Sequence, residues 1–82
     1  MTTALRTQKQ LGTELRRYRK KMNLTQDDLS RLIGKRQATI SNLELAGSGT
    51  LETLFVLLSA LDIELVLQPR TKGDRIKLED VF

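Results

Sequence analysis

The sequence predicts an all-α protein of four to five short helices followed by one strand. Apolar residues recur at steps of three or four in four successive stretches, which is the period of an amphipathic helix. Residues 63–68 differ, because they alternate apolar and polar side chains as a strand does. A chain of 82 residues forms one small domain that buries about 60 to 65% of its unfolded surface, so a partner chain is expected to add stability.

The first helix is predicted from about Thr7 to Met22, with a buried apolar face and an exposed basic face. The apolar face consists of Leu11, Leu15, Tyr18 and Met22. The basic face consists of Arg16, Arg17, Arg19, Lys20 and Lys21. Such a charge run is either a solvated face or a surface for phosphates or a partner.

The second helix is predicted to begin at Thr25, whose hydroxyl caps it while Asp28 completes a capping box. Gly34 suits the left-handed conformation that ends a helix. A third helix is predicted from Gln37 to Glu44 after a short turn. The residues of these two helices that are expected to face the core are Leu29, Leu32, Ile33, Ile40 and Leu43.

The fourth helix is predicted after a loop from Ala46 to Gly49, with Thr50 as its N-cap. It is apolar over more than one face, as the hub of a core or a dimer seam would be. Its apolar residues are Leu51, Leu54, Phe55, Leu57, Leu58 and Leu61, with Phe55 assigned to the core. The following strand ends at Pro69, which cannot donate a ladder hydrogen bond.

Composition excludes several classes of function. The chain has no cysteine and no histidine, so disulfides, the usual zinc sites and Ser/His or Cys/His catalysis are not expected. We therefore expect no enzyme, no metal and no cofactor. No apolar run approaches the roughly 18 residues of a membrane span, and residues 1–10 lack the features of a secretory signal, so a cytoplasmic protein without a membrane partner is expected.

Charge is divided unevenly along the chain. Residues 1–36 contain ten Lys or Arg against three Asp or Glu, a balance of +7. Residues 37–82 contain four against seven, a balance of −3. A basic half of this kind is typical of a protein that binds a polyanion such as nucleic acid, although it can also serve solubility alone.

The second and third predicted helices form two short helices joined by a tight glycine turn. This arrangement places the second helix of the pair in the major groove of DNA. Amide and hydroxyl side chains can meet the donors and acceptors of base edges there, and Ala or a Thr methyl can contact a thymine methyl. The exposed residues with this chemistry are Gln37, Ala38, Thr39, Ser41 and Asn42.

The same region resembles the lambda-repressor-like helix-turn-helix family. The residues at the family's spacing are Thr25, Gln26, Leu29, Ser30, Gly34, Ile40, Ser41 and Glu44. Ser30 departs from the alanine usual there, and Arg36 stands where a Ser or Thr cap is common. Residues 35–42, followed by one strand after the last helix, resemble the HipB-type antitoxins, which pair with HipA-type kinase toxins. The resemblance spans about residues 11–68.

The resemblance, the exposed polar chemistry of residues 37–42 and the position of Ser48 and Thr50 beside a helix N-terminus together predict site residues of three kinds. Base contacts are expected from Arg36, Gln37, Ala38, Thr39 and Ser41. Phosphate contacts are expected from Gln26, Lys35, Asn42, Ser48 and Thr50, with Gln26 also bracing Gln37. A homodimer is expected to close through Ile63, Glu64, Leu65, Val66, Leu67 and Gln68. Each of these DNA contacts has an alternative. Gln26 can be a solvated residue of the first turn, and Ser41 and Asn42 can be exposed polar residues without a ligand. Ser48 can be a loop residue only, and Thr50 a cap residue only.

The predicted organisation has three segments. Residues 1–10 form a flexible arm, residues 11–68 the helix-turn-helix DNA-binding and dimerisation domain, and residues 69–82 a polar, disordered tail. The predicted function is a dimeric repressor of a palindromic operator that is also the antitoxin of a HipA-like kinase. The alternatives are a stand-alone phage or housekeeping repressor and a protein-interaction module of the same fold.

Overall fold

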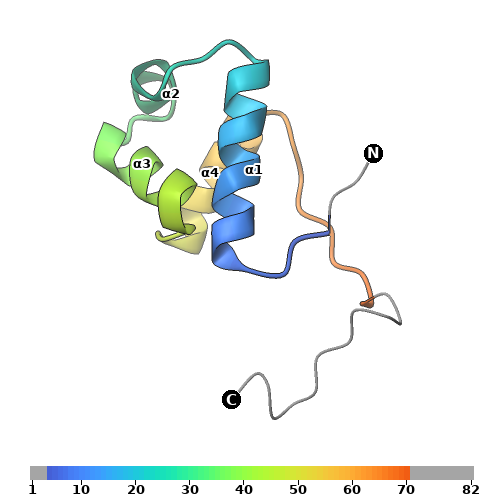
Figure 1. Ribbon diagram of the computed structural model, residues 1–82. Coiled ribbons are helices and arrows are strands. Elements are labelled where there is room, and N and C mark those ends of the chain that lie inside the picture. The colour runs from blue at the N-terminus through green and yellow to red at the C-terminus, as the bar shows by residue number, and fades with distance from the viewer. Residues whose placement is uncertain (1–3, 71–82) are drawn as a thin grey trace.

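The computed structural model describes residues 4–70, and in this range it has four helices (Figure 1). They are α1 (Gln8–Lys21), α2 (Gln26–Ile33), α3 (Gln37–Ala46) and α4 (Leu51–Ala60). Helix α1 packs mainly against α3, while α2 contacts both α3 and α4. Their shared core consists of Leu15, Leu29, Ile40, Leu43, Leu54, Leu57, Leu58 and Leu61.

Threonine hydroxyls cap three of these helices. Thr25 Oγ1 accepts from the Asp28 N–H at 3.0 Å, and an Asp28 carboxylate oxygen accepts from the Thr25 N–H at 2.9 Å, so the predicted capping box is confirmed. Thr50 caps α4 as predicted, and Thr7 caps α1. Gly34 ends α2 with φ +68°, which confirms the predicted left-handed residue.

Some predicted burials are wrong. Leu32 is 62% exposed and Phe55 is 57% exposed, and Met22 is also exposed. The cause is the position of each residue around its helix. Helix α2 buries Leu29 and partly buries Ile33, which stand four residues apart on one face, whereas the side chain of Leu32 points away from that face. In α4 the buried stripe is Leu54, Leu57 and Leu58, continued by the C-cap Leu61, and Phe55 lies beside it. Met22 follows the last residue of α1 as its C-cap.

The predicted boundaries change at three places. Residues 8–10 form the first turn of α1, as the helix predicted from about Thr7 requires and the flexible arm predicted over residues 1–10 does not, and α3 continues past Glu44 to Ala46. Residues 63–70 contain no assigned strand (Figure 1), because a strand needs a partner and a single chain offers none here. The ladder across a dimer therefore stays a prediction. Residues 1–3 of the arm and 71–82 of the tail lie outside the described residues.

No single helix within residues 4–70 has the length and apolar character needed to cross a membrane. Helices α3 and α4 reach that length and composition only when taken together, and they meet at 96°. The inward side chains of both helices belong to the core described above.

Because the capping box contains the carboxylate of Asp28, the fold is expected to lose stability when acid protonates that group. The backbone N–H of Thr25, followed by its hydroxyl, holds the pKa of Asp28 below its ordinary value of 3.8. A carboxyl whose pKa is lower in the folded state stabilises the fold above its unfolded pKa and loses that contribution as pH falls through the folded pKa. We expect Asp28→Asn to flatten the decline of melting temperature between about pH 5 and 2. An identical pH profile in the variant and the wild-type protein would contradict this.

Candidate nucleic-acid interface

The turn between α2 and α3 is held by local hydrogen bonds. The Lys35 N–H donates to the Ser30 carbonyl at 3.1 Å, and the Ser30 hydroxyl donates to the Lys35 carbonyl. This second bond explains why a small hydroxyl residue suits the position where the family usually has alanine. Arg36 is the N-cap of α3 and makes no side-chain cap hydrogen bond. Its exposed side chain lies at the start of α3, where the predicted base contact requires it.

Helix α3 separates a buried face from a polar one. Ile40 and Leu43 are buried, as predicted. Gln37, Ala38 and Asn42 are exposed, whereas Thr39 and Ser41 are half-buried. Steps of four residues place Gln37 above Ser41 and Ala38 above Asn42 on adjacent ridges of one face. The fold thus brings the predicted base-contacting residues together at the surface, with Thr39 and Ser41 less accessible than expected.

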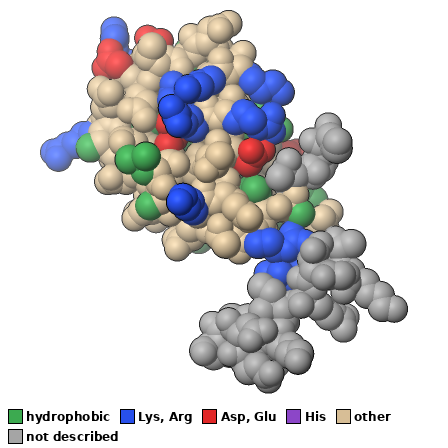
Figure 2. All heavy atoms as spheres, viewed as in Figure 1, with side chains coloured by type: hydrophobic (Ala, Val, Ile, Leu, Met, Phe, Trp, Pro, Cys, Tyr) green, Lys and Arg blue, Asp and Glu red, His purple; other side chains and the backbone are tan. Residues whose placement is uncertain are grey.

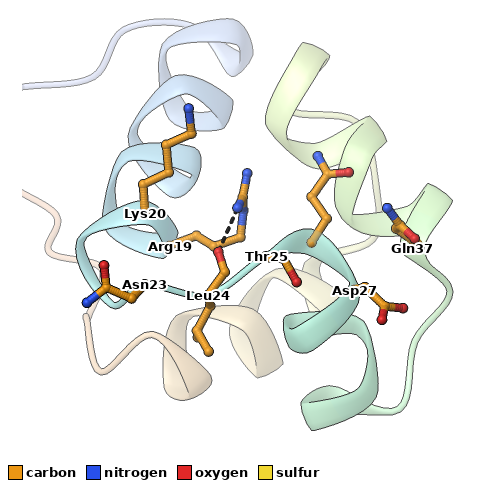
Figure 3. A pocket seen from close by; sticks show the side chains of 8 residues that line it. Arg19, Lys20, Asn23, Leu24, Thr25, Asp27 and Gln37 are labelled. Carbon is orange, nitrogen blue, oxygen red and sulfur yellow. Dashed lines mark hydrogen bonds between the residues drawn. The ribbon is translucent and has the colours of Figure 1, made fainter.

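A shallow hollow of about 490 Å³ lies beside this face, between the end of α1 and the start of α2 (Figure 3). Gln26 and Gln37 both line it, so the two glutamines expected to cooperate are close to one surface feature. Lys20 and Asn23 line it from the α1 side. The sequence placed Lys20 only within a general basic run.

The other predicted phosphate contacts lie around α3. Lys35 is half-buried in the turn, and Ser48 is exposed in the loop after α3. The Thr50 hydroxyl is engaged in the cap of α4, since it accepts from the Thr53 N–H at 3.1 Å and donates to Thr53 Oγ1 at 3.0 Å. This geometry favours the cap reading of Thr50 that the sequence left open.

A buried ion pair ties α1 to α3. Arg19 Nε donates to Glu44 Oε2 at 2.6 Å and Arg19 Nη2 to Glu44 Oε1 at 3.0 Å. Arg19 Nη1 also donates to the Leu24 carbonyl at 2.7 Å (Figure 3). Gln26 Nε2 donates to Glu44 Oε1 at 3.1 Å. The two charged side chains are only 9% and 2% exposed. Hydrogen bonding to Glu44 raises the pKa of Arg19, so the guanidinium stays charged.

The placement of Arg19 on a solvated basic face is therefore wrong. A signal was present in the sequence: Arg19 stands four residues after Leu15 and Glu44 four after Ile40, so each charge interrupts an apolar stripe. Opposite charges at such positions on two helices indicate a buried pair. The other basic residues predicted on that face, Arg16, Arg17, Lys20 and Lys21, are exposed, and Figure 2 shows Lys and Arg side chains gathered on the side that α1 presents.

The profile of the helix-turn-helix family matches residues 15–68. The chain belongs to this helix-turn-helix family. Solved structures of HipB resemble it over most of its length, which confirms the HipB-type resemblance. HipB in complex with an O2 20mer is 30% identical with a TM-score of 0.79, covering 87% of this chain and 100% of that one. HipB with an O4 20mer is 31% identical with a TM-score of 0.78, covering 85% and 100%.

A third solved structure is a HipA-HipB-O2-O3 complex, whose matching chain is 31% identical with a TM-score of 0.77, covering 85% of this chain and 100% of that one. No curated protein sequence matches significantly. This helix-turn-helix protein thus has the fold of DNA-binding transcription regulators. Its α2 and α3 are the helix-turn-helix pair.

Proposed function

We propose that this helix-turn-helix protein is a sequence-specific repressor that binds a palindromic operator as a homodimer and serves as the antitoxin of a HipA-like kinase. The observation that carries the DNA-binding part is the exposed polar face of α3, anchored from inside by the Arg19–Glu44 pair. A helix of this kind fits the major groove, where amide and guanidinium groups read base edges. Retention of operator DNA at physiological salt tests this part against a protein-interaction module that uses the same fold without DNA.

In the proposed complex, Arg36, Gln37 and the adjoining ridge of α3 contact bases. Gln26, Lys35, Asn42 and Ser48 surround that face and supply phosphate contacts. Thr50 adds only its backbone, because its hydroxyl is engaged in the cap. Phosphate contacts set the position of the protein on the duplex, while base contacts supply sequence preference.

Exposed apolar side chains support the proposed homodimer. Helix α4 exposes Leu51, Phe55 and Val56, and the segment after it exposes Leu65 and Leu67. A second copy can cover both groups if residues 63–68 of each chain pair as an antiparallel two-stranded ribbon, since a two-fold axis makes that pairing self-complementary. The same axis would place two copies of α3 about 34 to 36 Å apart, one helical turn of DNA.

The HipA-HipB-O2-O3 complex supports the antitoxin part of the proposal, because its matching chain resembles this one over most of its length. The proposed antitoxin would repress the operon that it shares with the kinase. The test is co-expression with any kinase encoded beside the gene, followed by purification through a tag on the kinase. Absence of such a kinase, or failure of the two chains to co-purify, would favour a stand-alone repressor.

Gln37→Ala tests the assignment of α3. We expect it to weaken binding to the operator by about 1 to 3 kcal/mol, because it removes a base-edge hydrogen-bonding group. Thermal stability should be unchanged, since Gln37 is exposed. The measurement is the ratio of affinities for the operator and for random DNA. Lys35→Ala is the control, because a lost phosphate contact lowers both affinities and reduces the slope of log K against log salt by about 0.9.

Leu65→Pro tests the dimer. Proline removes a ladder donor, so we expect monomers or unfolded chains in sedimentation and loss of operator binding. Val66→Thr is the matched control, because its side chain points to the opposite face of the proposed ribbon and the backbone donor is kept. A Leu65→Pro protein that stays dimeric and still binds its palindrome would place the seam along α4 instead.

A further inference from the structure

The hydrogen bond between Gln26 and Glu44 connects the buried core to the exposed hollow. Gln26 is half-buried as the first residue of α2 and lines the hollow together with Gln37. Its Nε2 donates inward to Glu44 Oε1 at 3.1 Å. We propose that Glu44 is a positioning residue for DNA recognition, which fixes the orientation of the Gln26 side-chain amide at the surface. This inference rests on the proposed operator binding through α3.

The chemistry of Glu44 allows only one orientation of the Gln26 amide. A carboxylate accepts hydrogen bonds and cannot donate them, whereas a glutamine amide has a donating and an accepting end. Turning the amide over would bring its oxygen against Glu44 Oε1 in place of a hydrogen bond, and a buried opposition of two acceptors is unfavourable. Gln26 therefore directs Oε1 and its second N–H away from Glu44.

Arg19 prevents the Glu44 carboxylate from rotating to suit a different orientation of Gln26. Both oxygens of Glu44 are held, Oε2 by Arg19 Nε and Oε1 by Arg19 Nη2, and Arg19 is itself held by the Leu24 carbonyl. Among the described residues, no buried side-chain nitrogen or oxygen lacks a hydrogen-bond partner. The acceptor that Gln26 meets is thus rigid. A side chain ordered before binding loses less conformational entropy when DNA arrives, which favours the complex that uses it.

If the Arg19–Glu44 pair orients Gln26, its removal should change DNA recognition; if the pair only stabilises the fold, its replacement should not. A buried ion pair can often be exchanged for apolar residues of similar volume without loss of stability. The paired substitution Arg19→Met and Glu44→Met should therefore keep the helices packed while removing the acceptor for Gln26. If the pair only supports the fold, this protein will discriminate DNA sequences as well as the wild-type protein does.

The experiment compares four proteins on the palindrome that the wild-type protein selects from a random-sequence pool. They are the wild type, Gln26→Ala, the Met pair, and the Met pair combined with Gln26→Ala. Gln26 is expected to brace the base-contacting Gln37 as well as to contact a phosphate, and both glutamines line the same hollow. We therefore expect Gln26→Ala and the Met pair each to lower the ratio of operator affinity to random-DNA affinity about tenfold, with no further loss in the combined variant. The Met pair should keep the wild-type salt slope, because its exposed cations are unchanged.

Two results would overturn the proposal: an unchanged ratio in the Met pair, or losses that add in the combined variant. Mobility of the Gln26 amide, measured by NMR relaxation on the unmodified protein, provides a test that does not depend on the variants folding. We expect a higher order parameter for the side-chain amide of Gln26 than for that of the exposed Gln37, which should fall below about 0.6 as in flexible groups. Equal mobility of the two amides contradicts the proposal. A wild-type protein that selects no sequence contradicts the proposed function itself.

Discussion

Glu44→Ala is expected to lower the free energy of unfolding by about 3 to 5 kcal/mol, because it leaves a buried guanidinium without its counter-ion. Arg19 would lose two of its three hydrogen bonds, keeping only the one to the Leu24 carbonyl. Gln26 would lose its partner in the same step. This loss is a large part of the 5 to 15 kcal/mol, roughly, that holds a small domain folded.

Urea unfolding followed by circular dichroism measures this effect. Glu14→Ala is the matched control, because Glu14 also pairs with an arginine, Arg17, at 2.7 Å. That pair lies on one exposed face of α1, where water and salt screen the charges, so a small change is expected. Equal losses in the two variants would show that burial of the Arg19–Glu44 pair does not determine its importance.

Gly12→Ala is expected to destabilise the protein by up to about 3 kcal/mol, the upper range for an overpacked core. Gly12 is buried in the interior of α1, where alanine would ordinarily stabilise a helix by about 1 kcal/mol. Here a Cβ atom would lie 2.4 Å from the Leu43 carbonyl oxygen and 2.6 Å from that of Glu44. Both atoms belong to the backbone of α3, so α1 and α3 would have to separate.

The measurement is again urea unfolding, at two protein concentrations so that any dimer is detected. Gly34→Ala is the control. Its Cβ would meet no atom within 4 Å, so the only cost is that alanine must adopt the left-handed φ of +68°. Its cost should be about 1 to 2 kcal/mol. A Gly12→Ala protein that is more stable than the wild type would mean that helix propensity outweighs the contact with α3.

Local chemistry explains why most helix boundaries could be predicted. Thr25 and Thr50 cap their helices through the N–H three residues later, and Gly34 adopts the conformation that few other residues tolerate. Each effect acts within one turn of the chain. The α2–α3 pair and the polar side chains at the start of α3 were predicted for the same reason.

Angular position around a helix was harder to predict. An apolar residue one step from the buried stripe has the same composition and nearly the same spacing as a buried one, so Leu32 and Phe55 were assigned inward. Only the direction from which the neighbouring helices approach separates the two cases. The sequence predicts that α4 has more apolar surface than one core face needs. It does not show whether Phe55 lies on the core face or on the exposed apolar face.

By itself the sequence determined the helix caps, the glycine turn, the polar face of α3 and the apolar stripes, because these depend on residues within a few positions of one another. Only the tertiary structure brought Arg19 and Glu44 together and placed Gln26 against the same carboxylate. The partners are 25 residues apart for Arg19 and Glu44 and 18 apart for Gln26 and Glu44. No local rule relates residues at such distances. The packing of α1 against α3, at the close approach that Gly12 permits, brings these groups together and excludes the water that would otherwise compete for their hydrogen bonds.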